Sequence, residues 1–113
     1  MTQYLVTIYR SDDYQPAVAE DDAMANAIDL LNNEMIAAGV RIFVGGLHPA
    51  RKARSLRAQP DGGVLVTEGP HLDTKENMGG FWVLDVDSLD DALTWAHKAV
   101  IACRASVEVR PFH

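Results

Sequence analysis

Two segments of the chain, Tyr4–Arg10 and Phe81–Val86, have the composition of β-strands and carry large apolar side chains on both faces. The faces of the first strand are set by alternate residues: Tyr4, Val6 and Ile8 on one side, and Leu5, Thr7 and Tyr9 on the other. Because apolar surface is driven out of water, each face needs a cover. This need for two covers limits the available folds more than any other feature.

Two amphipathic helices are available as covers. The first begins at Asp21 or Asp22 and ends at Gly39, a residue suited to a left-handed C-terminal position. Its apolar stripe consists of Met24, Ile28, Leu31, Met35 and Ala38. The second begins after Ser88, an N-cap that Asp91 can reach back to. Its predicted buried stripe consists of Leu89, Ala92, Leu93, Ala96 and Val100.

The rest of the chain predicts shorter strands and one hairpin. Val40–Leu47 and Ser106–Arg110 are strands, and Gly69–Gly80 is a polar loop. A hairpin is predicted around residues 60–63 (Pro-Asp-Gly-Gly), a strong turn sequence. Without the hairpin, the order is a split βαβ repeat, the ferredoxin-like pattern. We therefore expect one α+β domain over residues 1–113, with an antiparallel sheet and two helices on one face.

Two helices can cover only one face of such a sheet. The second apolar face of the Tyr4–Arg10 and Phe81–Val86 strands then needs another cover. Apolar patches of that size are rare on monomers, so a second subunit is the economical answer. The sequence therefore predicts a homodimer joined by these sheet faces.

Charge and cysteine content bound the partners and the compartment. Sixteen acidic against ten basic residues give a net charge of −6, which disfavours nucleic acid as a partner. No apolar run approaches the length of a membrane span, so no membrane partner is expected. The single cysteine, Cys103, fits a reducing cytoplasm and is expected to be buried and inert. A basic cluster, Arg51, Lys52, Arg54 and Arg57, is either solvated surface or a small-anion site.

Several segments together resemble the DGPF branch of the YCII-related proteins. Residues 66–76 look like the Asp-Gly-Pro-Phe signature and its trailing acidic-x-Lys-Glu, and residues 79–82 like the glycine pair and aromatic strand that follow it. Residues 45–49 and 107–112 are also similar to this family. The chain departs from the signature at Glu68, in place of aspartate, and at His71, in place of phenylalanine.

The resemblance implies a ferredoxin-like fold that dimerises as an α/β barrel. Proteins of this branch are often encoded beside sigma factors of the extracytoplasmic-function type, which suggests a regulatory or stress setting. The wider group carries a His–Asp pair proposed to be catalytic. This chain has residues 24–26 (Met-Ala-Asn) and 100–104 at the corresponding places, so an activity based on that pair is not transferable.

A cluster of titratable residues on glycine-flanked loops is the candidate site. His48, His71 and Asp73 are the candidate acid–base residues, because a carboxylate can orient an imidazole for proton transfer. The candidate ligand-binding residues are Lys75, Glu76, Trp82 and Arg54. We expect His48, His71, Asp73, Lys75 and Glu76 to share one pocket, with Trp82 as a wall. The alternative is a hydrogen-bonded loop that fixes the hairpin.

No P-loop, dinucleotide-binding or zinc-binding pattern occurs, so neither a cofactor nor a metal is predicted. Two functions fit this sequence. One is an enzyme that acts on a small polar or aromatic metabolite by His–carboxylate chemistry. The other is a non-catalytic module that binds a ligand or a partner and serves a regulator. A concave pocket with converging titratable groups would favour the first function.

Overall fold

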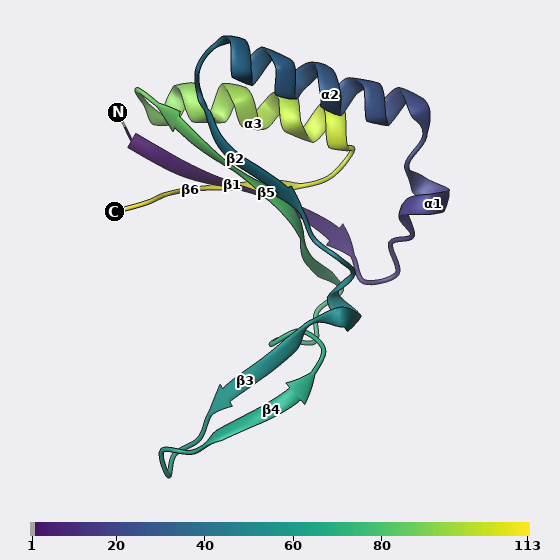
Figure 1. The fold of residues 1–113 in the computed structure, drawn as a ribbon, viewed down its shortest axis with the longest axis vertical. Helices are drawn as coiled ribbons and strands as arrows, with labels where there is room; N and C mark the ends of the chain where they lie inside the picture. The colour runs from purple at the N-terminus through teal and green to yellow at the C-terminus, as the bar shows by residue number, and fades with distance from the viewer. Residues whose placement is uncertain (1) are drawn as a thin grey trace.

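The computed structural model describes residues 2–113 and has the predicted order of strands and helices (Figure 1). Its strands are β1 (Thr2–Ser11), β2 (Arg41–Gly46), β3 (Arg54–Ala58), β4 (Val64–Glu68), β5 (Glu76–Val86) and β6 (Val107–Pro111). Its helices are α1 (Pro16–Ala19), α2 (Asp22–Ala37) and α3 (Leu89–Cys103), with a 3-10 turn at Ala50–Lys52. Within residues 2–113, no helix has the length and apolar character needed to cross a membrane.

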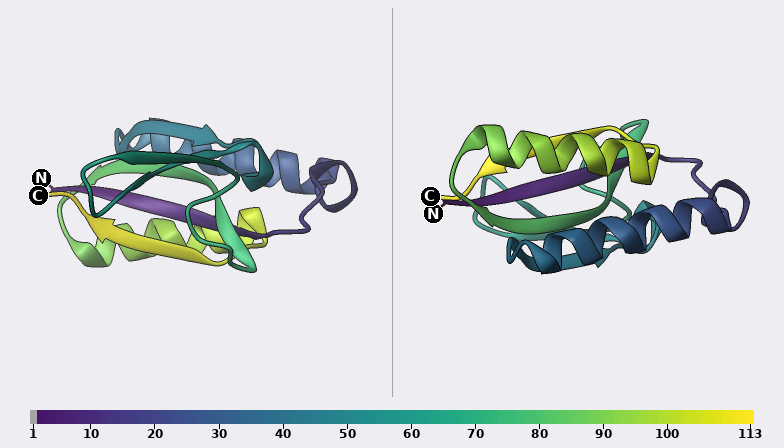
Figure 2. Two further views of the ribbon diagram at one scale, coloured as in Figure 1. Left: turned by 90° about the horizontal axis from the view of Figure 1, so that it is seen from below. Right: turned by 90° about the horizontal axis from the view of Figure 1, so that it is seen from above.

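The main sheet has four antiparallel strands in the order β2-β5-β1-β6. Helices α2 and α3 lie side by side on one face of this sheet, as the view from above shows (Figure 2). The strand order and the two helices confirm the predicted ferredoxin-like α+β fold. The short helix α1, between β1 and α2, was not predicted from the sequence.

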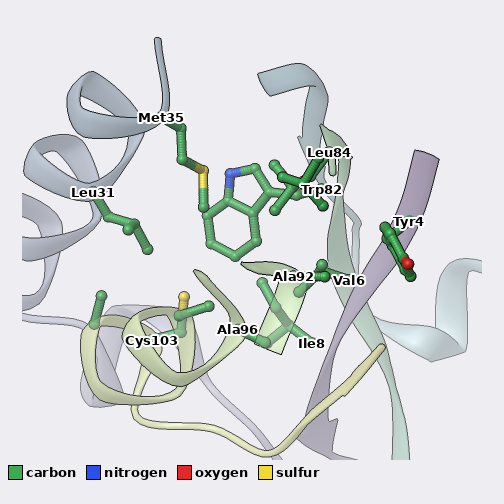
Figure 3. Close-up of a cluster of buried hydrophobic side chains, with 13 residues drawn as sticks. Tyr4, Val6, Ile8, Leu31, Met35, Trp82, Leu84, Ala92, Ala96 and Cys103 are labelled. Carbon is green, nitrogen blue, oxygen red and sulfur yellow. The ribbon is translucent and has the colours of Figure 1, made fainter. Parts of the chain in front are cut away.

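The core lies between the sheet and the two long helices (Figure 3). Trp82 is at its centre and is 1% exposed, and its indole nitrogen donates a 2.9 Å hydrogen bond to Asn32 Oδ1 on α2. That bond satisfies the only polar atom of the indole, so the ring can be buried without a penalty. The other fully buried large side chains are Met24, Met35, Leu84, Val6 and Cys103.

Helix α3 meets the core with small side chains, which confirms the predicted stripe at Ala92 and Ala96 and corrects it at Leu89, Leu93 and Val100. Its buried residues are Ala92, Ala96, Ala99, Ala102 and Cys103. Leu89, Leu93 and Val100 are instead exposed, at 51%, 48% and 41%. An alanine face lets the helix approach the Trp82 layer closely, and the larger residues are turned aside. The stripe predicted for α2 is confirmed at Met24, Leu31 and Met35, whereas Ala38 is exposed.

Strand β5 is longer than predicted, because the second half of the expected Gly69–Gly80 loop is part of the sheet. It begins at Glu76, which pairs with Ser11 at the end of β1. The glycine pair within it permits a close approach of β2. A Cβ added at Gly80 would lie 2.8 Å from the carbonyl oxygen of Gly45. Any side chain at position 80 would therefore force the backbone of one of the two strands to move.

The predicted hairpin is confirmed as a separate two-stranded sheet of β3 and β4, with the turn at residues 59–63 between them. We call residues 54–68 the arm. The arm extends away from the four-stranded sheet on the side opposite to the helices (Figure 1). It therefore adds nothing to the core that Trp82 occupies.

The face of the sheet opposite to the helices, here the helix-free face, carries apolar side chains from three strands. Leu5, Phe81 and Val83 are half-buried, and Phe43 is 54% exposed and packs against Phe81 with ring centroids 5.7 Å apart. Residues 2–113 do not close into a barrel: the sheet is open, with β2 and β6 at its edges.

Candidate functional site

A pocket of about 380 Å³ lies at the end of the main sheet where β1 finishes and α2 begins. Its floor is apolar, because it is lined by core-facing residues of three strands and of both long helices: Ile8, Val44, Trp82, Ile28 and Cys103. The glycine pairs of β2 and β5 form one wall. Leu47 donates its backbone N–H to the carbonyl of Gly79 at 2.9 Å, which fixes the segment after β2 beside that wall.

Polar side chains from the end of β1 and the segment that follows it also line the pocket, and form its polar rim. Arg10 donates a 2.7 Å hydrogen bond to the carbonyl oxygen of Cys103, and its guanidinium lies 4.5 Å from the centre of the Tyr14 ring. The Tyr14 hydroxyl donates a 2.6 Å hydrogen bond to Glu20. Arg10 thus ties the rim to the C-terminal end of α3, and the ring and the guanidinium stack as a unit.

The phenol of Tyr14 is held in its neutral form. Partial burial, and then the hydrogen bond to Glu20, raise the pKa of Tyr14 from 10.0 to about 12. The Arg10 guanidinium opposes this rise but does not cancel it. The rim therefore presents the Arg10 guanidinium as a hydrogen-bond donor and the neutral Tyr14 oxygen as an acceptor, because the single phenol proton is donated to Glu20.

Cys103 lies at the bottom of the pocket and is 2% exposed. Burial is the main reason that the pKa of its thiol is raised. A thiol of raised pKa carries little thiolate and is a poor nucleophile. The predicted buried cysteine is confirmed, and its thiol acts as apolar floor.

Two of the sequence-predicted site residues line this pocket. Trp82 forms part of the floor, and His48, which is exposed, lies on the rim just after β2. His48 and Tyr14 thus reach the same cavity from segments that are far apart in the sequence.

The other predicted site residues are outside the lining. His71 is exposed and lies against the arm: Arg57 donates to its carbonyl oxygen at 2.5 Å and lies 3.3 Å from its Nδ1. Lys75 is exposed, and its backbone carbonyl accepts from the N–H of Asp12, a lining residue, at 2.7 Å. Asp73, Glu76 and Arg54 are also exposed, and Arg54 is 4.0 Å from Glu68 on the arm.

Arg10, Tyr14 and Glu20 were not predicted as site residues. From the sequence, Arg10 is the last residue of a strand and residues 11–20 are a polar stretch with Pro16. The available signal was a charged residue at a strand end and an aromatic residue four positions later, and no established motif has that spacing. Within residues 2–113, no three His, Cys, Asp or Glu side chains are grouped as metal ligands would be.

Comparison with known proteins gives a family but no activity. The model of the YCII-related domain matches residues 2–113. The chain is also similar to an uncharacterized protein of Rhizobium meliloti (strain 1021), with 32% identity over 112 residues. That match covers 96% of this chain and 90% of the relative.

Proposed function

The chain belongs to the YCII-related family, and on that premise we propose that it binds a small organic molecule in the pocket at the end of β1, β2 and β5. The observation that carries this proposal is the division of the pocket into an apolar floor and a polar rim. Small-molecule sites have this character: mostly apolar, with a few polar groups that fix the orientation of the ligand. The signature-like residues 66–76 support placing the chain in the DGPF branch.

The apolar floor and the polar rim of the pocket together favour a ligand that is apolar at one end and polar at the other. The floor around Trp82 suits an aromatic or aliphatic body. Arg10 uses one nitrogen for Cys103, and its other N–H groups suit a carboxylate or another oxygen acceptor. We therefore expect a small metabolite with an apolar body and an acceptor-bearing end.

The same geometry supports acid–base catalysis as a second function. An imidazole can take up and release a proton near neutral pH, and His48 shares the cavity with the neutral phenol of Tyr14. In this proposal His48 is the proton acceptor, and the free N–H groups of Arg10 donate a hydrogen bond to the charge that develops on the ligand. A role for His71 and Asp73 beside His48 stays a prediction.

A thermal-shift screen against a metabolite library tests ligand binding, and titration calorimetry with each hit measures its affinity. Tyr14→Phe and His48→Ala should each weaken binding about tenfold, since each removes one polar contact to the ligand. His97→Ala, on the exposed surface of α3, is the matched control and should change nothing. Wild-type affinity in both pocket variants would contradict the proposal, and a loss in His71→Ala would support the shared site predicted from the sequence.

Comparing turnover with affinity in His48→Ala distinguishes catalysis from binding alone. If the protein is an enzyme, His48→Ala should reduce turnover of the bound compound at least 100-fold, while the affinity changes only severalfold. A compound that binds tightly and is recovered unchanged by wild-type protein would leave binding as the whole function.

We also infer that two copies associate through their helix-free faces, as a dimeric barrel requires. The support is the apolar surface of Leu5, Phe43, Phe81 and Val83, over which no helix lies. Sedimentation should show a dimer at micromolar concentration. Phe43→Asp should dissociate it, whereas Val18→Asp, at a residue 80% exposed on α1, should not. A wild-type monomer at that concentration would contradict the dimer.

A further inference from the structure

We propose that the arm is a docking element whose apolar face packs against a second copy of this chain. We call this surface, Leu56, Ala58, Val64 and Val66, the bare face of the arm. The inference rests on the proposed dimer and goes beyond it, because it gives the arm a role in holding the two copies together.

The two faces of the arm are treated differently by the rest of the chain. On one face, Ser55 is only 8% exposed and donates from its hydroxyl to the carbonyl of Gly69 at 2.8 Å. Arg57, on the same face, holds the backbone and ring of His71. The signature-like loop after β4 therefore covers this face. The opposite, bare face has no such cover: Leu56, Val64 and Val66 are 68%, 64% and 61% exposed.

The hydrogen bonds at its base give the arm a fixed direction. Gly69 donates its backbone N–H to the carbonyl of Ala53 at 2.8 Å and accepts from Ser55. The arm is thus attached at both ends of its base and directed away from its own core (Figure 1). An isolated two-stranded hairpin is at best marginally stable in water. A hairpin that is built rigidly and left apolar on one face needs a cover from outside its own chain.

The size of the molecule agrees with a missing cover. Its accessible surface is 7694 Å², against about 6,100 Å² for a compact monomer of its mass. Its radius of gyration is 16.0 Å, against about 13 Å for a compact domain of its length. The excess surface exceeds the roughly 800 Å² that each partner buries in a stable interface.

Charge favours a second copy as the occupant. Residues 51–57 hold four of the ten basic residues, while the whole chain has a net charge of −6. Residues 51–68, the arm and the turn at its base, hold four basic and two acidic residues, a net charge of +2, so the remaining residues carry −8. The base of the arm is therefore basic and the body acidic, and the base of one copy is attracted to the body of another. On the helix-free face, Asp85 Oδ1 is buried and has no hydrogen-bond partner among residues 2–113. A basic group from a second arm would satisfy this carboxylate.

Two leucines on opposite faces of the arm provide a matched test. Leu56→Ser changes the bare face and Leu65→Ser the covered face of the same hairpin. Measured by sedimentation over a concentration series, Leu56→Ser should weaken the dimer about tenfold. Leu56→Ser combined with Val66→Ser should weaken it further, and Leu65→Ser should change it less than threefold.

Hydrogen exchange of the wild-type protein gives a second measurement that needs no variant. The amides of β3 and β4 should be protected at concentrations where the dimer forms and should lose that protection on dilution. Protection that does not depend on concentration, or a double variant that dimerises as well as wild type, would overturn the role of the arm and leave the sheet-face dimer standing. A wild-type monomer would overturn both.

Discussion

At the scale of single residues, Tyr14 and Glu20 make the clearest prediction for the pocket. The difference in ultraviolet absorption between wild type and Tyr14→Phe should show a phenol that ionises near pH 12. Glu20→Gln should lower this pKa part of the way towards 10, because it removes the negative charge beside the hydroxyl and leaves only a neutral acceptor, while the burial of the ring is unchanged. Asp13→Asn, an exposed neighbour, is the control. An unchanged titration in Glu20→Gln would refute the pairing.

The sign of the linked stability change follows from the raised pKa. The folded state holds the Tyr14 proton more tightly than the unfolded state does, so the contribution to stability is complete below pH 10. It is lost as the pH rises from 10 towards 12. Tyr14→Phe should therefore flatten the fall in stability over that alkaline window.

Of the residues that line the pocket, sequence reasoning singled out His48 and Trp82, which lie in distinctive segments. His48 follows a glycine pair and Trp82 follows another, so both attract attention. Arg10, Tyr14 and Glu20 meet only because β1 continues to Ser11 and the chain then turns back towards α2. No local pattern encodes that meeting, since it depends on the length of a strand and the direction of a loop.

At the scale of elements, the packing of β2 on β5 depends on Gly80. Gly80→Ala should destabilise the protein by about 1–3 kcal/mol, because its Cβ would collide with the backbone of Gly45. Gly46→Ala is the control and should cost less stability. Gly46 pairs with Gly80 across the two strands, and a Cβ there would meet nothing within 4 Å. Chemical denaturation measures both variants, and equal losses would contradict the close approach.

An ion pair joins the start of α2 to the end of α3. Asp21 caps α2 by accepting from Met24 N–H, and it contacts Arg104 through two hydrogen bonds of 3.1 Å. The Arg104 bond first, and the Met24 N–H second, lower the pKa of Asp21 below its ordinary 3.8. The stabilising contribution is therefore present above pH 3.8 and is lost as the pH falls through the lower, folded value.

Arg104→Ala should consequently remove part of the loss of stability below pH 4, when acid unfolding is followed by circular dichroism. Arg51→Ala removes the same charge from a residue that forms no ion pair within residues 2–113. Identical acid profiles for wild type and Arg104→Ala would show that the ion pair does not contribute.

Periodicity predicted the elements better than it predicted their faces. The stripe of α2 was recovered because its buried residues, Met24, Leu31 and Met35, recur at helical spacing, while Leu30 and Ile36, which are outside that spacing, are exposed. On α3 the rule that large apolar residues face inward failed, because the helix packs on the core through four alanines and Cys103. The side of α3 that is buried depends on the sheet residues against which the helix packs. Those residues are far from α3 in the sequence, so the pattern within the helix could not reveal it.

At the scale of the whole molecule, association and stability should be linked. If two copies cover each other's apolar surfaces, the melting temperature should rise with protein concentration, by about 2–4 °C for each tenfold increase. Leu56→Ser should weaken this dependence, while Leu65→Ser keeps it. Calorimetric scans over two decades of concentration measure the effect, and a constant melting temperature would contradict the association.

The position of Cys103 has a practical consequence. It is the only thiol of the chain, and it lies at the bottom of the pocket. We therefore expect a small thiol reagent to reach the sulfur through the site, and to react slowly because the thiol is buried and protonated. Any compound that occupies the cavity should shield the sulfur further. The rate at which Cys103 is labelled should therefore fall when a ligand occupies the pocket, so unknown ligands can be screened by measuring that rate on the native chain.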